Sequence, residues 1–303
     1  MRLPDFMVGG VRKCGTTSLV DALRTHPRLF IPARKELAFY DRADWESMLD
    51  WYAEQFAEAA PDQLVGEATP HYLDSAEACR RIHQTQPAVK LVFLLRNPVE
   101  RAQSHYWARV RFGREERSLL EVLQSETASL DADPQADSGY LVVPGLYGRN
   151  LRRYLDRFGP EQIRVILLED LRRDPDDELA ELQRFLGVEE ASLELPWVNE
   201  ASETRNRSLQ HAIEWLSEFQ GIGKRALRTV VPSELRRRIR FRLYDLNKKP
   251  ESKPVLDSET QLVLTRIYEE DLHIPADQIQ RPVTEWLRDR DVPANVVHHH
   301  GIA

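Results

Sequence analysis

The chain has 303 residues, of which 42% are hydrophobic and 30% charged, with a formal net charge of −7 at pH 7. This composition is typical of a soluble globular protein, and the negative balance excludes nucleic-acid binding driven by overall charge. Two cysteines, Cys14 and Cys79, exclude a disulfide framework and argue against a cysteine-based zinc site. Because we find no signal-peptide pattern and no apolar run of about 18 residues, we expect a cytoplasmic protein.

A strand, a glycine-containing turn and a helix are predicted at the start of the chain. The apolar run 5–9 predicts a strand, and a helical pattern extends from Leu19 to His26. Between them, Gly10 and Gly15 have the G-x-x-x-x-G spacing of a phosphate-binding loop. Such a turn directs backbone N–H groups at an anion, and the dipole of the following helix favours the same negative charge.

The loop lacks the lysine of a nucleoside-triphosphate site. In kinases and GTPases that lysine follows the second glycine, and the next hydroxyl holds Mg²⁺. Here Thr16 and Thr17 occupy both positions, while the basic residues Arg12 and Lys13 lie inside the loop. A ligand with a single 5′ phosphate and no metal ion fits this pattern better than a triphosphate. The spacing alone also suits a strand-to-helix turn with a surface lysine, so the loop leaves both interpretations open.

Strands and helices alternate further along the chain. The apolar run 89–95 predicts a buried strand, and Asn97, Pro98 and Glu100 form a helix start with an approximate capping box. Val99, Ala102, Tyr106 and Val110 are the expected inner face of that helix. The remaining elements are expected to be a helix at 118–130, a loop at 131–139, a helix through 151–158, a strand at 163–168 and helices at 176–186 and 258–272. Leu262, Ile267 and Leu272 are among the apolar positions of the last helix.

This order predicts an α/β fold, with a P-loop-type parallel sheet flanked by helices and a helical C-terminal region. We expect one domain over 1–303, with a basic helical insertion at 209–257. Within it, 221–253 holds eleven Lys or Arg residues against three acidic ones.

Two motifs together give the first loop a more specific meaning. Residues 10–19, GVRKCGTTSL, resemble the 5′-phosphosulfate loop of sulfotransferases that use 3′-phosphoadenosine 5′-phosphosulfate (PAPS). They are most similar to bacterial enzymes related to the heparan sulfate group. Residues 94–107, LLRNPVERAQSHYW, resemble the same family's 3′-phosphate motif. Two motifs in the expected order, about 80 residues apart, are more specific than either alone. The resemblance implies metal-free transfer of a sulfuryl group to a hydroxyl or amine, with release of 3′-phosphoadenosine 5′-phosphate (PAP).

The resemblance also implies the residues that bind the donor. The 5′ phosphosulfate would lie against Arg12, Lys13, Cys14, Gly15, Thr16, Thr17 and Ser18. Of these, Lys13 would stabilise the charge that develops on the leaving phosphate. Arg96 and Ser104 would bind the 3′ phosphate. As an alternative, Arg96 pairs with Glu100 and Ser104 lies on a helix surface. Arg205, Asn206 and Arg207 match a late loop that closes over the nucleotide.

The segment 32–41, PARKELAFYD, resembles a family segment whose glutamate is the proposed general base. Glu36 would then take the proton of the acceptor, and Asp41, at the end of the segment, would assist on the acceptor side. A plain surface pair of Lys35 and Glu36 is the alternative. Ala38 stands where heparan 3-O-sulfating enzymes have histidine.

A second departure from the family lies in 66–74, GEATPHYLD, which resembles Glu-Lys-[Thr/Ser]-Pro-x-Tyr. Ala68 replaces the lysine that contacts the sulfuryl end in the heparan enzymes. Either Lys13 serves alone, or Lys35 or His71 substitutes. Ala38 and Ala68 favour one alternative, a non-catalytic nucleotide-binding module; a kinase with a degenerate loop is the other.

The acceptor is not identified by any of these motifs. A carbohydrate, a lipid, a glycopeptide and a small natural product all remain open. The basic segment 221–253 would attract an anionic acceptor or a membrane surface, although a solvated charged helix face is the commoner explanation of such a pattern.

Overall fold

The computed structural model describes residues 2–137, 139–196, 202–204, 248–250, 256–269, 271, 272 and 286. The chain divides into two compact units, Met1–Val198 with Leu256–Ala303, and Asn199–Val255. In the second unit, the described strands β6 (Ser202–Thr204) and β7 (Lys248–Pro250) pair antiparallel. Most of the predicted basic insertion lies outside the described residues, so its helical character stays a prediction.

The first unit is built on a five-stranded sheet in the order β2-β3-β1-β4-β5. Every adjacent pair of strands runs parallel. The strands are β1 (Phe6–Gly10), β2 (Leu29–Phe30), β3 (Leu64–Ala68), β4 (Lys90–Leu95) and β5 (Ile163–Leu167). Parallel neighbours end at the same edge, and the last residue of β1, Gly10, pairs with Leu94 of β4. The loops after these two central strands therefore leave the sheet side by side.

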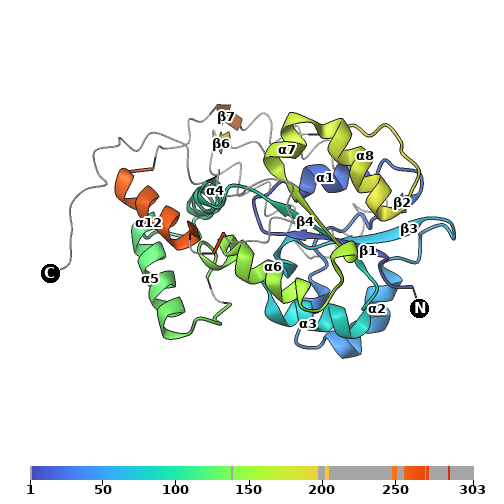
Figure 1. The fold of residues 1–303 in the computed structure, drawn as a ribbon, viewed down its shortest axis with the longest axis horizontal. Coiled ribbons are helices and arrows are strands. Elements are labelled where there is room, and N and C mark those ends of the chain that lie inside the picture. The colour runs from blue at the N-terminus through green and yellow to red at the C-terminus, as the bar shows by residue number, and fades with distance from the viewer. Residues whose placement is uncertain are drawn as a thin grey trace, which may run out of the picture. The chain divides into compact units, whose positions relative to one another are not determined.

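Helices lie on both sides of this sheet (Figure 1). On one side are α1 (Thr16–Leu23), α7 (Leu168–Arg173) and α8 (Pro175–Leu186), and on the other are α2 (Leu49–Glu54), α3 (Ala76–Thr85) and α6 (Tyr147–Leu155). Three further helices, α4 (Pro98–Arg111), α5 (Leu119–Ala132) and α12 (Ser258–Glu269), pack together, with α12 against both others. No described helix is long and apolar enough to cross a membrane.

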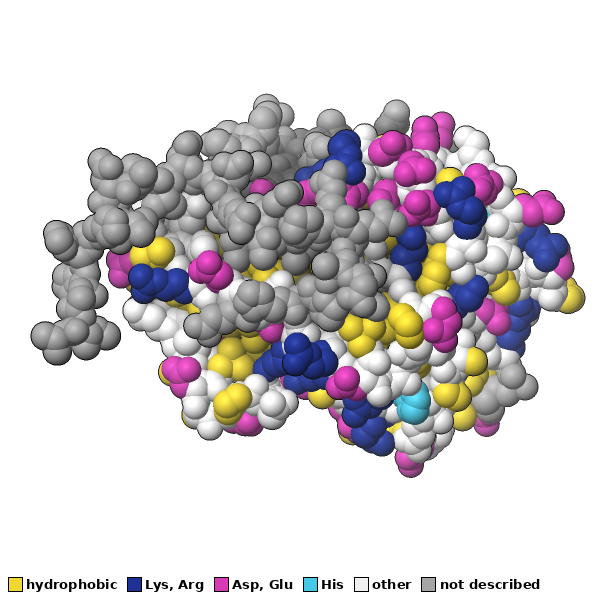
Figure 2. All heavy atoms as spheres, viewed as in Figure 1, with side chains coloured by type: hydrophobic (Ala, Val, Ile, Leu, Met, Phe, Trp, Pro, Cys, Tyr) yellow, Lys and Arg dark blue, Asp and Glu magenta, His cyan; other side chains and the backbone are white. Residues whose placement is uncertain are grey.

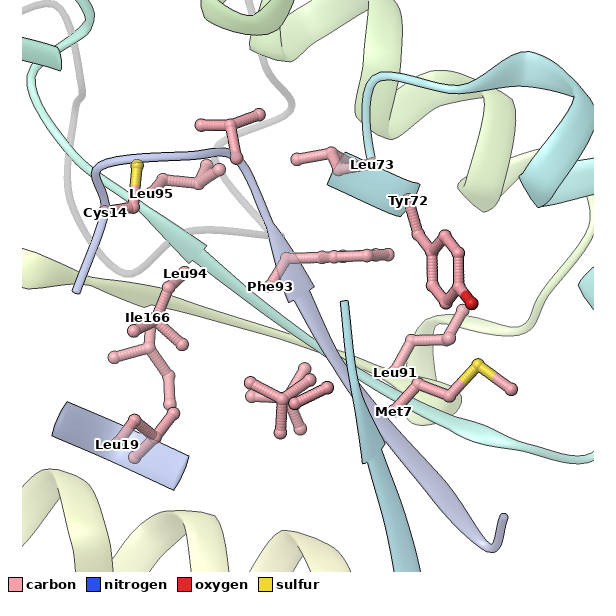
Figure 3. Close-up of a cluster of buried hydrophobic side chains, with 14 of the residues drawn as sticks. Met7, Cys14, Leu19, Tyr72, Leu73, Leu91, Phe93, Leu94, Leu95 and Ile166 are labelled. Atoms are coloured by element: carbon pink, nitrogen blue, oxygen red, sulfur yellow. The ribbon is translucent and has the colours of Figure 1, made fainter. Parts of the chain in front are cut away.

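Both faces of the central strands are buried, as expected for a parallel sheet covered on both sides. In Figure 3, Leu94 and Ile166 point toward Leu19 of α1, while Phe93 on the opposite face points toward Tyr72. Short 3₁₀ turns complete this second side: η1 (Phe39–Asp41), η2 (Trp45–Met48) and η3 (Pro70–Tyr72). Burying an aromatic or aliphatic side chain of this kind stabilises the fold by about 1.5–3 kcal/mol. This packing fixes the ends of β1, β3 and β4, from which the candidate site is built.

The structure confirms the predicted strands at 5–9, 89–95 and 163–168 within one or two residues. It adds elements that the pattern did not predict, among them β2, α2, β3, α3 and α7. Periodicity missed β3 because the strand is only five residues long and carries a glutamate, Glu67, which is nevertheless buried.

Three local predictions need correction. The capping box at α4 is absent: Asn97 caps the helix by accepting from the N–H groups of Val99 and Glu100, but the Glu100 carboxylate turns to the charged Arg96 instead. The inner face of α4 also contains Arg101 and His105; the buried Arg101 guanidinium donates to the carbonyls of Tyr140 and Leu141. The last correction concerns α12, where Leu262 is 42% exposed and the buried face is formed by Thr260, Leu264 and Tyr268.

Candidate active site

The loop after β1 depends on glycine at both ends. Gly10 has a φ of 121°, and a Cβ there would lie 2.3 Å from the carbonyl oxygen of Leu94. Gly15 has a φ of 89°, and its Cβ would lie 2.8 Å from a methyl group of Leu168. L side chains rarely adopt such φ values, so the close approach and the sharp turn both require glycine. The G-x-x-x-x-G spacing read from the sequence thus has a steric basis in the fold.

The loop leads into a helix N-terminus that suits an anion. Gly15 is the N-cap of α1; among the described residues no side chain caps this end, and the first turn has no acidic residue. By contrast, α7 and α8 carry Glu169, Asp170, Asp176, Asp177 and Glu178 in their first turns, and acidic side chains gather over these helices in Figure 2. Negative groups stabilise helix N-termini. The first turns of α7 and α8 supply such groups themselves, whereas the start of α1 is suited to bind an anion from outside the helix.

Lys35 lies at this helix start. Its Nζ donates to Thr17 Oγ1 at 2.7 Å and to Thr16 Oγ1 at 3.3 Å. The ammonium is also 3.9 Å from Glu36 Oε1, and the Lys35 side chain is only 16% exposed. Burial lowers the pKa of Lys35 from its usual value, with the charge of Glu36 acting in the opposite direction. A second cation is therefore held at the loop beside Lys13, and it comes from the segment that carries the predicted base.

The turn around Glu36 has an unusual backbone. Among the described residues, three other than glycine have a positive φ: Lys13 at 77°, Glu36 at 59° and Ala38 at 49°. Such conformations cost energy and cluster at functional sites. Two hydrogen bonds tie the turn to the end of β3, from Glu36 N to Ala68 O at 3.0 Å and from Ala38 N to Thr69 Oγ1 at 3.2 Å. Glu36 therefore lies beside residues 10–18, which we call the donor loop, and its side chain is 45% exposed.

A buried carboxyl group that the sequence did not reveal lies under this turn. Glu67 of β3 is buried, and its Oε1 accepts a 2.5 Å hydrogen bond from the Thr69 hydroxyl. Burial raises the pKa of Glu67 to about 8; the Thr69 bond opposes this shift, and the charges of Asp41 and Glu36 add to it. The side chain therefore carries a proton at neutral pH. Its only sequence signal was a glutamate inside a short apolar stretch.

Arg96 follows β4, the neighbour of β1 in the sheet, and contacts the loop that follows β1. It is 6% exposed and donates to Lys13 O at 3.4 Å and to Glu100 Oε2 at 2.7 Å. The ion pair with Glu100, which the sequence allowed as the alternative, is thus present together with a loop contact. Arg96 Nε finds no hydrogen-bond partner among the described residues. Ser104 lies on α4, partly buried.

Cys14 points away from the ligand side of the loop. Its side chain is buried beside Leu95 (Figure 3), and its Sγ lies 4.0 Å from the hydroxyl of Tyr147. Burial raises the pKa of Cys14 to about 12, so the thiol stays protonated and unreactive. The side chain of Cys14 is therefore a packed core residue.

On the predicted acceptor side, His71 of η3 contacts two other predicted site residues, Arg12 and Asp41. Its Nδ1 lies 3.1 Å from Arg12 Nη2, and its Nε2 lies 2.5 Å from Asp41 Oδ2. The predicted residues Arg12, His71 and Asp41 are therefore joined in one chain of contacts. Arg205, Asn206 and Arg207 lie outside the described residues, so their nucleotide contacts stay a prediction.

A sulfotransferase domain model matches residues 3–217 of the chain. The chain belongs to the sulfotransferase family. The predicted α/β fold is confirmed by its likeness to a crystal structure of a sulfotransferase from Alicyclobacillus acidocaldarius, with a TM-score of 0.64, 27% identity and coverage of 94% of this chain and 99% of that one. A mouse sulfotransferase complexed with PAP shares the fold at a TM-score of 0.51 and 12% identity, covering 95% of this chain and 89% of that chain.

Two human enzymes are similar in sequence. Over 201 residues, the chain is 33% identical to bifunctional heparan sulfate N-deacetylase/N-sulfotransferase 3, covering 62% of this chain and 22% of that enzyme. Over 187 residues it is 32% identical to heparan sulfate glucosamine 3-O-sulfotransferase 6, covering 62% of this chain and 53% of that enzyme. The match therefore spans only a fifth to a half of these relatives.

The residues of this sulfotransferase fit an adenosine phosphosulfate. A small loop that requires glycine, a helix start without a side-chain cap among the described residues, and the mostly buried Lys35 on the hydroxyls of Thr16 and Thr17 suit one anionic group. Arg96 Nε, which has no hydrogen-bond partner within the part of the chain that the structure describes, adds a second polar group. No group of three His, Cys, Asp or Glu side chains among the described residues is arranged to hold a metal ion, and the metal-free reaction stays a prediction.

Proposed function

We propose that this sulfotransferase transfers the sulfuryl group of PAPS to a hydroxyl or amine of an acceptor and releases PAP. The observation that carries the proposal is the position of Lys35, whose ammonium lies on the hydroxyls of Thr16 and Thr17. These threonines stand where a triphosphate loop has its lysine and its metal-binding hydroxyl. The cation needed for a phosphosulfate is thus supplied from a neighbouring turn rather than from the loop position itself.

The donor would be held by residues from two strand ends. The backbone after Gly10, the hydroxyls at the start of α1, Lys13 and Lys35 would bind the 5′ phosphosulfate, and Arg96 with Ser104 would bind the 3′ phosphate. PAPS itself supplies the sulfuryl group and a phosphate that leaves with the bonding electrons. Lys13 and Lys35 would stabilise the negative charge that grows on that leaving phosphate.

Glu36 would act as the general base. Its carboxylate is half exposed, so an acceptor can reach it, and the ammonium of Lys35 lies 3.9 Å from Glu36 Oε1. Glu36 would take the proton of the acceptor hydroxyl or amine while the acceptor atom bonds to sulfur. The strained backbone at Glu36 agrees with a position selected for chemistry rather than for stability.

One alternative draws support from Ala38 and Ala68, which replace two polar residues of the heparan enzymes. A protein that kept the nucleotide pocket and lost turnover would show the same two alanines. The position of Lys35 argues against this alternative, because a cation remains at the loop.

Calorimetric titration of the purified chain with PAP, ATP and AMP in the presence of EDTA tests the donor. We expect PAP to bind at least about tenfold more tightly than ATP. Equal affinities for PAP and ATP would refute the proposal, as would magnesium-dependent ATP consumption. An acceptor screen with ³⁵S-labelled PAPS over carbohydrates, lipids, glycopeptides and small natural products then separates an active enzyme from a binding module. Glu36→Gln serves as the inactive control.

A further inference from the structure

Three side chains from three separate segments form a single hydrogen-bonded line. Arg12 belongs to the loop after β1, His71 lies on η3 after β3, and Asp41 ends η1. The imidazole stands between the other two, with Nδ1 at 3.1 Å from Arg12 Nη2 and Nε2 at 2.5 Å from Asp41 Oδ2. The donor loop and the turn that carries the predicted base are therefore joined through one ring.

The partners of His71 define its protonation pattern. A guanidinium has only donors, so Nδ1 must accept from Arg12 and cannot itself carry a proton. The ring proton is then on Nε2, where it donates to the Asp41 carboxylate. A doubly protonated ring would set two donors against each other at 3.1 Å. In this hydrogen-bonded chain, Arg12 donates to His71 Nδ1, and His71 Nε2 donates to Asp41 through a neutral imidazole.

The surroundings hold this arrangement in place. The His71 side chain is 16% exposed, and its ring packs edge-on against Tyr72 with the centroids 5.9 Å apart. Asp74 is also nearby, and burial raises its pKa to about 6. Asp41 is five residues from Glu36, in the segment anchored to the end of β3. A substitution at Asp41 would thus alter the predicted acceptor side of the site, next to the predicted base.

We propose that His71 is a positioning residue that holds the Arg12 guanidinium in place for the donor and couples donor binding to Asp41. The inference rests on the proposed function, since it needs an anionic donor at the loop. An arginine whose side chain is already ordered binds an anion more tightly than a free one, because less conformational entropy is lost on binding. Asp41 contributes through the ring, by anchoring Nε2 and keeping Nδ1 an acceptor.

A double-mutant cycle with PAP affinity as the readout tests this coupling. We expect His71→Ala and Asp41→Ala each to weaken PAP binding about fivefold, and the double variant to bind no more weakly than His71→Ala. Asp44→Ala is the matched control, since Asp44 lies in the same segment, is half exposed and pairs with Arg42. That control should leave the affinity within about twofold of the wild type.

Each outcome has a separate meaning. Additive losses in the double variant would overturn the proposal, because Asp41 would then act through space. Tighter PAP binding by His71→Ala would also overturn it, because His71 would then compete with the donor for Arg12. If the wild-type chain fails to bind PAP at all, the proposed function fails instead. A ¹⁵N NMR spectrum of the imidazole gives a readout without any variant: a proton on Nδ1 rather than Nε2 would refute the described line.

Discussion

Replacing Lys35 by methionine tests the central claim about the donor site. The change keeps an unbranched, flexible side chain one heavy atom shorter and removes the ammonium that lies 2.7 Å from Thr17 Oγ1 and 3.3 Å from Thr16 Oγ1. A hydrogen bond to a charged group contributes about 1.5–3 kcal/mol, which corresponds to a loss of roughly 10- to 150-fold. We therefore expect kcat/KM for PAPS to fall by about that factor. The fall in PAP affinity should be smaller if Lys35 acts on the sulfuryl end, since PAP lacks that group.

The same substitution should not destabilise the free protein. Burial lowers the pKa of Lys35, so the folded state binds its proton less tightly than the unfolded state does. Between the folded and unfolded pKa values the unfolded chain carries more protons, and stability rises with pH across that window. Below it, the charged lysine is a net cost to folding, which an uncharged methionine avoids. We expect Lys35→Met to have a melting temperature equal to or above that of the wild type at neutral pH.

Lys90→Met is the matched control for both measurements. Lys90 begins β4 at the opposite end from the donor loop, and its ammonium donates to the carbonyls of Phe185 and Leu186. Its removal should lower stability and leave PAP affinity unchanged in calorimetry. If Lys35→Met keeps both PAP affinity and kcat/KM within about twofold of the wild type, Lys35 is a structural lysine and the reasoning is wrong.

Three further substitutions test the remaining roles. Glu36→Gln should keep PAP affinity while kcat falls by about 10²–10⁴, as expected for loss of a general base; an unchanged kcat in the ³⁵S assay would remove that role. Arg96→Ala should weaken PAP by at least about tenfold more than AMP in parallel titrations, whereas equal losses would exclude a 3′-phosphate contact. Glu67→Gln should remove a pH dependence of folding. Because the pKa of Glu67 is raised from 4.5 to about 8, its contribution to stability is present below pH 4.5 and is lost as the pH rises through 8. Chemical denaturation of Glu67→Gln should thus show a gain over the wild type at pH 8 to 9 and none near pH 4; a constant difference would contradict the assignment.

The sequence predicted the parts of the site whose signal is local. The glycine spacing, the helix start after it and the apolar strand before Arg96 each depend on residues close in the chain, and the structure has all three. Two motifs in order also carried the family assignment, which the domain match confirms. Local pattern was sufficient here because a strand, a turn and a helix start have few alternative conformations.

The sequence could not predict the polar groups that tertiary contacts bury. Arg101 and His105 lie on the inner face of α4, where Arg101 donates to two carbonyls about 40 residues further along the chain. Burial, together with the charge of Arg101, lowers the pKa of His105 to about 3. Glu67 is buried in a similar way, and the Thr69 hydroxyl donates a hydrogen bond to its carboxyl group. Hydrophobic periodicity assigns such residues to the surface, because the partner that offsets their desolvation is not visible in the local pattern.

Ala68, which stands where the heparan enzymes have a lysine, is connected to Lys35 through the backbone of Glu36. Ala68 has no charged side chain to offer the sulfuryl site, yet its carbonyl accepts the N–H of Glu36 at 3.0 Å and so anchors the strained turn. That turn brings Lys35, the residue before Glu36, onto the hydroxyls of the donor loop. The backbone of Ala68 therefore anchors the turn whose Lys35, in the proposed donor site, would supply the charge of the family lysine. If Lys35 has this role, a lysine side chain at position 68 would only add a second cation near the same end of β3.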